Sequence, residues 1–262
     1  MGDIARCSLG KPGEFYSEEL LYQMFGVNAE LLIDHAWGYE PCTIAQIRAY
    51  KPQSSSLGCG QVLPCPYTAD KARIVVQEMI DGISLELVEK RLVTDQLVLT
   101  VGYDIENLTR PEIRKVYKGP VTTDRYGRRV PKHAHGTWNL PRATSSSSEL
   151  LEAMAALYDK IVNPALLIRR MSLSACHVVN EKMAKEREQK ETFEQLDLFT
   201  DYAKKEAKEK EEQKKRERER RMQEALLTIK KKYGKNAVLR GMNFEEGATA
   251  KERNGQIGGH QA

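Results

Sequence analysis

The first 50 residues alternate short apolar runs with glycine and proline. Ser17 opens a run at Glu18–Phe25, Asn28 opens a second at Ala29–Trp37, and a glycine follows each run. Serine and asparagine are common helix N-caps and glycine commonly ends a helix, so both runs are predicted helices. Helices this short build only a thin core. Residues 39–54 lack such a pattern and are predicted to be a linker.

From Ser54 the pattern becomes a repeat of strand, helix and strand. The predicted elements are strands Ser54–Leu63 and Gln96–Val101 around helix Tyr67–Leu92, then strands His135–Thr144 and Leu167–Val179 around helix Ser148–Val162. They rest on β-branched runs and on long amphipathic stretches with capping residues. This order predicts an α+β fold in which one sheet carries both helices on one face.

The tail after Glu181 has a different composition. Sixteen of the eighteen residues 204–221 are charged, in mixed sign. That pattern predicts a solvated single helix, supported by charge pairs three and four residues apart. A further helix is predicted at Ala225–Tyr233 with Gly234 at its end, and the glycine-rich sequence after it is predicted to be mobile.

One apolar cluster, Gln195–Phe199, lies inside this charged tail. The flanking sequence buries too little apolar surface to fold alone, and an apolar cluster on a solvated tether usually meets a pocket on another molecule. The alternative is that Leu196 and Phe199, one helical turn apart, dock onto the chain's own domain.

Charge changes the picture locally rather than globally. Residues 1–180 hold 20 basic and 20 acidic residues, so the net charge of +4 lies in the tail. Within the neutral part, nine basic residues are opposed by only Glu112 and Asp124: Arg110, Arg114, Lys115, Lys118, Arg125, Arg128, Arg129, Lys132 and Arg142. A patch of this kind suits a polyanion.

Cysteine usage and hydropathy indicate the compartment. The five cysteines have no C-x-x-C spacing and are odd in number, so we expect reduced thiols rather than a disulfide framework or a zinc site. The sequence has no secretory signal pattern and no apolar run of membrane-spanning length. We therefore expect a cytoplasmic protein with no membrane partner.

Catalytic constellations are not evident in the sequence. His133 and His135 have no cysteine or carboxylate at a metal-ligand spacing and are interpreted as polar strand-end residues. Cys176 and His177 are adjacent in a predicted strand and so point to opposite faces. No phosphate loop, dinucleotide fingerprint or paired acidic motif for two cations occurs. We predict no catalytic residue, no metal ligand and no cofactor for this chain.

Binding chemistry is better represented, at the ends of two predicted strands. Hydroxyl and cationic side chains gather there: Lys51, Ser54, Ser55 and Ser56 at the first strand, and Thr137, Arg142, Thr144, Ser145 and Ser146 at the third. Such groups suit phosphate oxygens, which position a protein on a duplex without reading sequence. The alternative role, capping the next helix, is sufficient for Ser147 and Ser148. Trp138 is the one aromatic candidate for base stacking, which disfavours single-strand binding.

Several short motifs together resemble one family. They are Gly2-Asp3-Ile4-Ala5, Phe25-Gly26, Asp34-His35-Ala36-Trp37-Gly38, Ser54–Gly58, Gln96–Gly102, Asn139-Leu140-Pro141-Arg142-Ala143-Thr144 and Ile168-Arg169-Arg170. Over residues 2–180, in this order, the chain resembles the thumb end and little finger of Y-family translesion DNA polymerases of the UmuC/DinB (ImpB/MucB/SamB) type. Gln195–Phe199 is similar to the peptide with which bacterial polymerases grip the sliding clamp. The closing sequence from Lys235 is similar to the tail of UmuC-type members from Gram-positive bacteria.

The resemblance implies a division of the chain and a set of contacts. Residues 1–48 would be a partial thumb of short helices, 49–182 a β-α-β-β-α-β little finger with two helices on one face, and 183–262 a charged helical or disordered tail. The partners would be double-stranded primer–template DNA and the bacterial sliding clamp, in translesion synthesis and DNA repair within the SOS response. The expected DNA contacts are Lys51, Ser54, Ser55, Ser56, Arg125, Arg128, Arg129, Lys132, Arg142, Thr144 and Ser145. The expected clamp contacts are Gln195, Leu196, Leu198 and Phe199.

The chain departs from the family in lacking the palm and fingers with their Mg2+-binding carboxylates. Met1 stands where the resemblance places the middle of the thumb. We therefore expect an artificial or internal start, a truncated gene, or a genuine stand-alone product. We expect DNA binding without nucleotidyl transfer by this chain alone. Two alternatives are a half-enzyme that needs a separate palm and fingers chain, and an interaction module that occupies the clamp without touching DNA.

Overall fold

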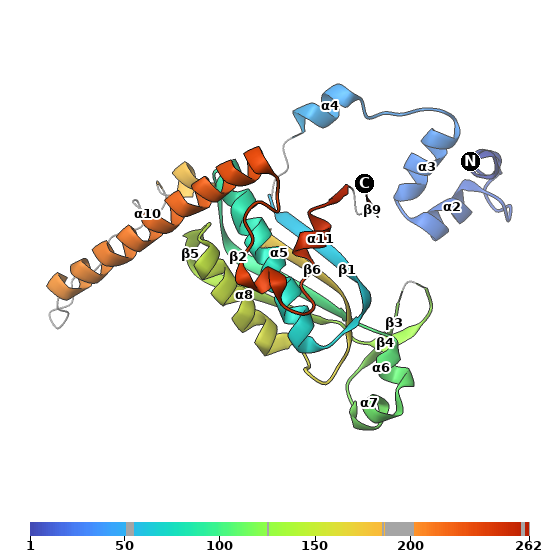
Figure 1. Ribbon diagram of the computed structural model, residues 1–262. Helices are drawn as coiled ribbons and strands as arrows, with labels where there is room; N and C mark the ends of the chain where they lie inside the picture. Colours follow the sequence, from blue (N-terminus) through green and yellow to red (C-terminus); the bar gives the residue numbers. More distant parts are fainter. Residues whose placement is uncertain (51–54, 125, 185, 187–201, 258–259, 262) are drawn as a thin grey trace. The chain divides into compact units, whose positions relative to one another are not determined.

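The computed structural model describes residues 1–50, 55–124, 126–184, 186, 202–257 and 260–261. Two compact units form, residues 1–53 and 54–262, so the helical tail belongs to the same unit as the sheet (Figure 1). The predicted clamp peptide Gln195–Phe199 lies outside the described residues, as do Lys51, Ser54 and Arg125.

The first unit is a small helical cluster. Its helices are α1 (Gly2–Cys7), α2 (Glu18–Phe25), α3 (Asn28–Ala36) and α4 (Ile44–Ala49). The second has the predicted bounds, with Ser17 as N-cap, and the third begins at the residue predicted to cap it. Its core is as thin as its helix lengths predict, with Cys7, Leu21 and Ala29 buried.

The predicted linker contains a helix. Thr43 and Gln46 form a capping box at the start of α4, with the Gln46 backbone N–H donating to Thr43 Oγ1 over 3.3 Å. Reciprocal capping satisfies two N–H groups that a short helix would otherwise leave unpaired.

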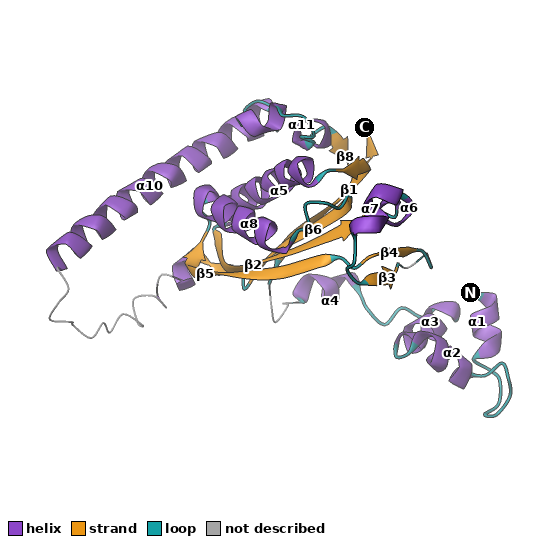
Figure 2. Ribbon diagram, turned by 90° about the horizontal axis from the view of Figure 1, so that it is seen from below, coloured by secondary structure: helices purple, strands orange, loops and turns teal. Residues whose placement is uncertain are grey.

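The second unit is built on an antiparallel sheet, and the α+β class is confirmed. Its long strands are β1 (Leu57–Tyr67), β2 (Leu92–Tyr103), β5 (Ala134–Thr144) and β6 (Ile168–Cys176), in the order β1-β6-β2-β5. The short strand β7 (Val179–Asn180) also pairs with β2. Helices α5 (Ala69–Lys90) and α8 (Ser147–Ile161) lie on one face of the sheet (Figure 2).

Strand alternation divides the sheet into a buried and an open face. Leu97 and Leu99 of β2 and Leu173 and Ala175 of β6 are all 0% exposed, under the two helices. Successive side chains point to opposite faces, so the residues between them face away from the helices. No described helix is long and apolar enough to cross a membrane.

An insertion between β2 and β5 carries part of the basic run. It consists of α6 (Glu106–Thr109), α7 (Pro111–Val116) and a hairpin of β3 (Val121–Thr123) and β4 (Arg129–Pro131). The sequence predicts only a turn-rich stretch here, since each of these elements is short.

The charged tail packs onto the sheet unit. A single helix, α10 (Tyr202–Tyr233), includes both predicted tail helices and ends at Gly234, whose φ of +96° favours glycine. Its N-terminal part extends beyond the sheet in Figures 1 and 2. After it come a 3-10 turn η1 (Gly241–Phe244), α11 (Ala250–Arg253), β8 (Gln256–Ile257) and β9 (His260–Gln261).

The segment after α10 is docked, and the prediction of a mobile end is wrong for its described residues. The carboxylate of Glu78 on α5 accepts hydrogen bonds from Asn243 Nδ2 and from the backbone N–H of Thr249, both over 2.8 Å. Arg240 also pairs with Asp81 over 2.7 Å. Polar contacts to α5 thus hold a sequence that is too poor in apolar residues to form a core of its own.

Candidate nucleic-acid interface

The open face of the sheet presents small, uncharged side chains. Its cross-strand rows follow from the register: Gly58, Ser174, Val98 and Thr137 in one, Gly60, Ser172, Thr100 and His135 in the next, and Val62, Arg170 and Gly102 in a third. These rows contain no carboxylate, their one aromatic ring is the imidazole of His135, and Arg170 supplies their one fixed charge. The result is a shallow, donor-rich surface that a polyanion can approach.

Arg170 owes its position to a glycine on the neighbouring strand. A Cβ placed on Gly102 would lie 2.6 Å from Arg170 Cγ, so only glycine lets this side chain lie across β2. The guanidinium borders a pocket of about 260 Å³, lined also by Thr100, His133 and Ser172. A cationic group beside hydroxyls can hold a phosphate oxygen.

The β3–β4 hairpin brings further cations to one end of β5. Arg128 pairs with Asp124 over 2.8 Å, and its guanidinium lies 5.0 Å from the centre of the Tyr126 ring. A hydrogen bond from the Arg128 backbone N–H, together with its guanidinium, lowers the pKa of the Asp124 carboxyl. Arg129 and Lys132 are exposed and form no ion pair within the described part of the chain. These two cations are free to meet an anionic partner.

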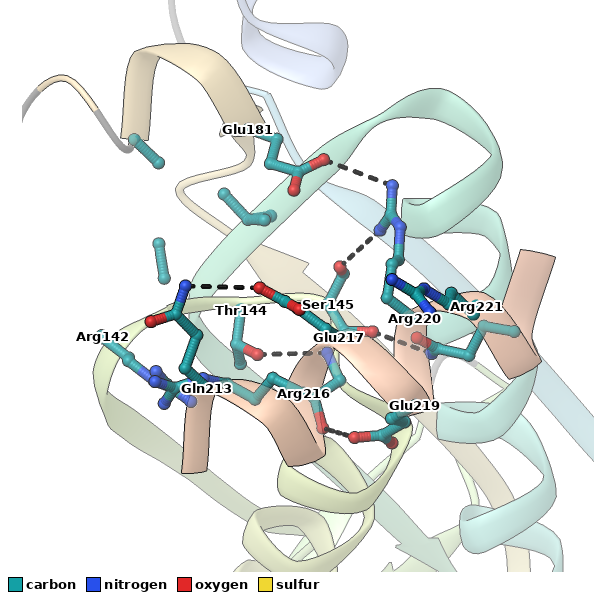
Figure 3. A pocket seen from close by; sticks show the side chains of 15 residues that line it. Arg142, Thr144, Ser145, Glu181, Gln213, Arg216, Glu217, Glu219, Arg220 and Arg221 are labelled. Carbon is teal, nitrogen blue, oxygen red and sulfur yellow. Dashed lines mark hydrogen bonds and ion pairs between the residues drawn. The ribbon is translucent and has the colours of Figure 1, made fainter. Parts of the chain in front are cut away.

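The other end of β5 holds Arg142, Thr144 and Ser145, and all three are already engaged. Arg142 forms an ion pair with Glu149 of α8. Thr144 Oγ1 accepts from the backbone N–H of Ser146 over 3.1 Å. We call residues 142–148, where the strand meets the helix, the β5–α8 corner. A cavity of about 490 Å³ lies between this corner and α10 (Figure 3).

Helix α10 covers the corner. Arg220 Nη1 donates to Ser145 Oγ over 3.1 Å, and Gln223 Nε2 donates to the Ser145 carbonyl over 3.0 Å. Glu219 accepts hydrogen bonds from Ser146 and Ser148. Figure 3 shows Glu219 and Arg220 on the side of α10 that faces the corner. Ser145 and Ser146, two of the predicted contact residues of this corner, therefore hold the tail helix in the structure.

The serines before β1 have a structural use. Ser55 Oγ donates to the carbonyl of Val178, and the Val178 backbone N–H donates to the Ser55 carbonyl over 3.0 Å. Ser56 is exposed next to it. The register places these serines at the same end of the sheet as the β5–α8 corner. Leu57 is level with the middle of β5, through Ala175 and Leu97, and β1 runs from there toward the start of β5. The residues before Leu57 therefore lie on the side of the corner.

The two basic places lie at opposite ends of β5. The register joins Ala134 to Val101 and Thr144 to Thr94, so the two ends are about seven residue steps of β2 apart, which at about 3.3 Å per step is about 23 Å. The open face runs between them. Trp138 packs against the core on the other face, so it is not available to stack on a base there.

Sequence reasoning found part of this surface. Thr137 was predicted and lies on the open face, whereas Arg170 entered only within a family motif and received no role. Alternation in 168–176 carries the missing signal, because Met171, Leu173 and Ala175 are buried and the residues between them must face outward. Which outward face remains uncovered depends on where the helices pack.

Comparisons with known proteins add no assignment. Neither a scan against protein-family models nor a search of curated proteins gave a match. Within the described residues, no group of three or more His, Cys, Asp or Glu side chains could hold a metal ion.

Proposed function

We propose that this chain binds duplex DNA through the open face of its sheet, as the DNA-gripping and clamp-tethered C-terminal part of a Y-family translesion polymerase. In this proposal the sheet unit is the little finger and contacts the phosphate backbone of primer–template DNA. The peptide Gln195–Phe199 would bind the sliding clamp, and nucleotidyl transfer would require a palm and fingers from elsewhere.

The observation that carries the proposal is the composition of the open face. Small hydroxyl and glycine positions allow a duplex to approach the strands closely, and Arg170 offers a cation at the end of the face where β5 begins. A carboxylate would repel the phosphates, and the three rows contain none. Phosphate contacts of this kind give affinity that depends strongly on salt and little on sequence.

The placement of the flanking cations supports the same partner. The hairpin with Arg129 and Lys132 and the corner with Arg142 lie at opposite ends of β5. Cations at both ends of the open face can meet phosphates of the same duplex.

The test is a titration of a fluorescent primer–template duplex at low and moderate salt. We expect affinity to fall steeply with salt, and Arg170→Ala and Arg129→Ala each to weaken binding by about threefold to tenfold. Lys160→Ala is the matched control, since Lys160 is exposed on the helix side of the sheet unit. A flat salt response, or equal losses in all three variants, would refute the proposal.

Clamp binding distinguishes the interaction module. The chain could bind the clamp but no DNA, with clamp affinity unchanged by charge reversal at Arg128, Arg129 and Arg142. That result would support the interaction module and refute the DNA-binding proposal.

The half-enzyme remains a second candidate because of the first unit. Met24, Phe25, Val27 and Leu31 of the α2–α3 region are 40–82% exposed. Exposed apolar groups of this kind suit a partner surface. Mixing this chain with palm and fingers of a Y-family polymerase should then restore primer extension, and Val27→Asp should abolish the restored activity. No extension under any ratio would exclude this reading.

A further inference from the structure

Glu219 of α10 occupies the start of α8 with its carboxylate. Its Oε2 accepts from Ser146 Oγ over 2.6 Å and from Ser148 Oγ over 2.9 Å, and its Oε1 accepts from the Ser148 backbone N–H over 2.8 Å. Ser146 is the N-cap of this 15-residue helix. Hydroxyls and an amide at the positive end of a helix are the donors that also hold phosphate oxygens.

The residues beside Glu219 extend the contact along the corner. Gln223 is 2% exposed and donates to the Ser145 carbonyl and, over 2.8 Å, to Ser147 Oγ. Arg220 donates to Ser145 Oγ and pairs with Glu181 over 3.2 Å. Duplex DNA and this stretch of α10 cannot both use the Ser145 side chain and the donors after it.

We propose that α10 is an internal competitor for DNA at the β5–α8 corner. Glu219 takes the place of a phosphate group while the helix is docked, and binding of the duplex across β5 requires this part of α10 to leave the corner. The inference rests on the proposed function, because it specifies how access to that same surface is regulated.

The composition of the contact allows such a release. Met222, the one large apolar residue of 213–224, is 57% exposed, so undocking of this stretch uncovers little apolar surface. The bonds that would break are polar and can be replaced by water or by phosphate. Mixed charge at a spacing of three and four residues supports the helix after release. Beyond it, Lys231 pairs with Glu89 over 2.7 Å, so the C-terminal end of α10 can stay attached as the rest moves.

Two substitutions and a matched control test the competition in the full chain. Glu219→Gln removes the carboxylate charge, Gln223→Ala removes two buried hydrogen bonds without a charge change, and Glu212→Gln changes the same charge on an exposed part of α10. Apparent affinity scales with the fraction of molecules in which α10 has left the corner. We therefore expect Glu219→Gln to bind duplex about tenfold more tightly than the wild type, and Gln223→Ala to show a smaller gain in affinity. Glu212→Gln should change the affinity by less than about twofold. Hydrogen exchange of amides 213–224 should accelerate when wild-type protein is saturated with duplex.

The outcomes separate this inference from the proposed function. Salt-dependent duplex binding with equal affinities for Glu219→Gln and Glu212→Gln would overturn the competition alone. Unchanged protection of residues 213–224 at saturating duplex would do the same. Absence of duplex binding in the wild type and in all three variants would overturn both proposals.

Discussion

Glu78 provides the sharpest test of how the C-terminal segment is held. Its side chain lies on α5 and is 7% exposed. Besides the bonds from Asn243 Nδ2 and the Thr249 backbone N–H, it accepts from Thr249 Oγ1 over 3.2 Å and from the Ala250 backbone N–H over 3.0 Å. Four donors from one segment thus converge on one carboxylate. Glu78→Ala removes the acceptor for all of them.

The expected cost follows from these contacts. Hydrogen bonds to a charged group contribute about 1.5–3 kcal/mol each, and water compensates part of the loss once the segment undocks. We expect Glu78→Ala to lower the free energy of unfolding by about 3 kcal/mol, and Glu78→Gln, which keeps one acceptor oxygen, by about half as much. For a unit of this size, about 3 kcal/mol corresponds to a decrease in Tm of roughly 6–12 °C.

The assay combines thermal unfolding with hydrogen exchange of residues 240–254. Faster exchange in this segment is expected in both Glu78 variants. Lys71→Ala is the control, since it removes an exposed ion pair to the same segment, Lys71 with Glu246 over 2.5 Å, and exposed ion pairs contribute little to stability. Equal stability of Glu78→Ala and Lys71→Ala, with unchanged exchange, would refute the reasoning.

Three further predictions concern the sheet unit and the tail. Gly102→Ala should displace the side chain of Arg170 and weaken duplex binding severalfold, while Tm stays within a few degrees, as titration and thermal unfolding would show; unchanged affinity would contradict it. The bidentate contact from Arg73 lowers the pKa of Asp159. A double-mutant cycle on this pair should therefore give a coupling energy of about 0.5 kcal/mol above pH 4, which is lost as pH falls through the lowered pKa. A coupling energy that grows as pH falls would contradict this prediction. Alanine at the last two residues of Gln195–Phe199 should abolish clamp binding in a pull-down and leave DNA affinity unchanged; loss of both would mean that the peptide is part of the fold.

The elements that follow from local pattern were largely predictable. Helix α2 has its N-cap at the predicted Ser17, and β5 begins within one residue of its predicted start. Helix α8 begins one residue earlier than predicted, and its N-cap is Ser146 rather than Ser147 or Ser148. Strand β1 was harder, because glycines and prolines in 58–66 weaken its alternation and it begins three residues later than predicted. Backbone hydrogen bonds to β6 hold this segment as a strand, although its own sequence pattern favours a strand only weakly.

The candidate surface depended on information that no local pattern contains. Arg170 could be placed on an outward face from the burial of its neighbours, but the sequence did not indicate that the helices would leave that face open. The serines of the β5–α8 corner fit both phosphate binding and helix capping. The structure adds a third use, the docking of α10. No local pattern predicts this contact, because Glu219 lies more than seventy residues further along the chain.

The sequence by itself determined the α+β order of strands and helices, the charged helix of the tail and its end at Gly234, since capping, alternation and glycine conformation act within a few residues. Only the tertiary structure decided that α10 covers the corner and that the segment after it closes on Glu78. Those contacts join residues 73 to 171 positions apart through single polar groups. Their partners are ordinary surface residues until the fold brings them together.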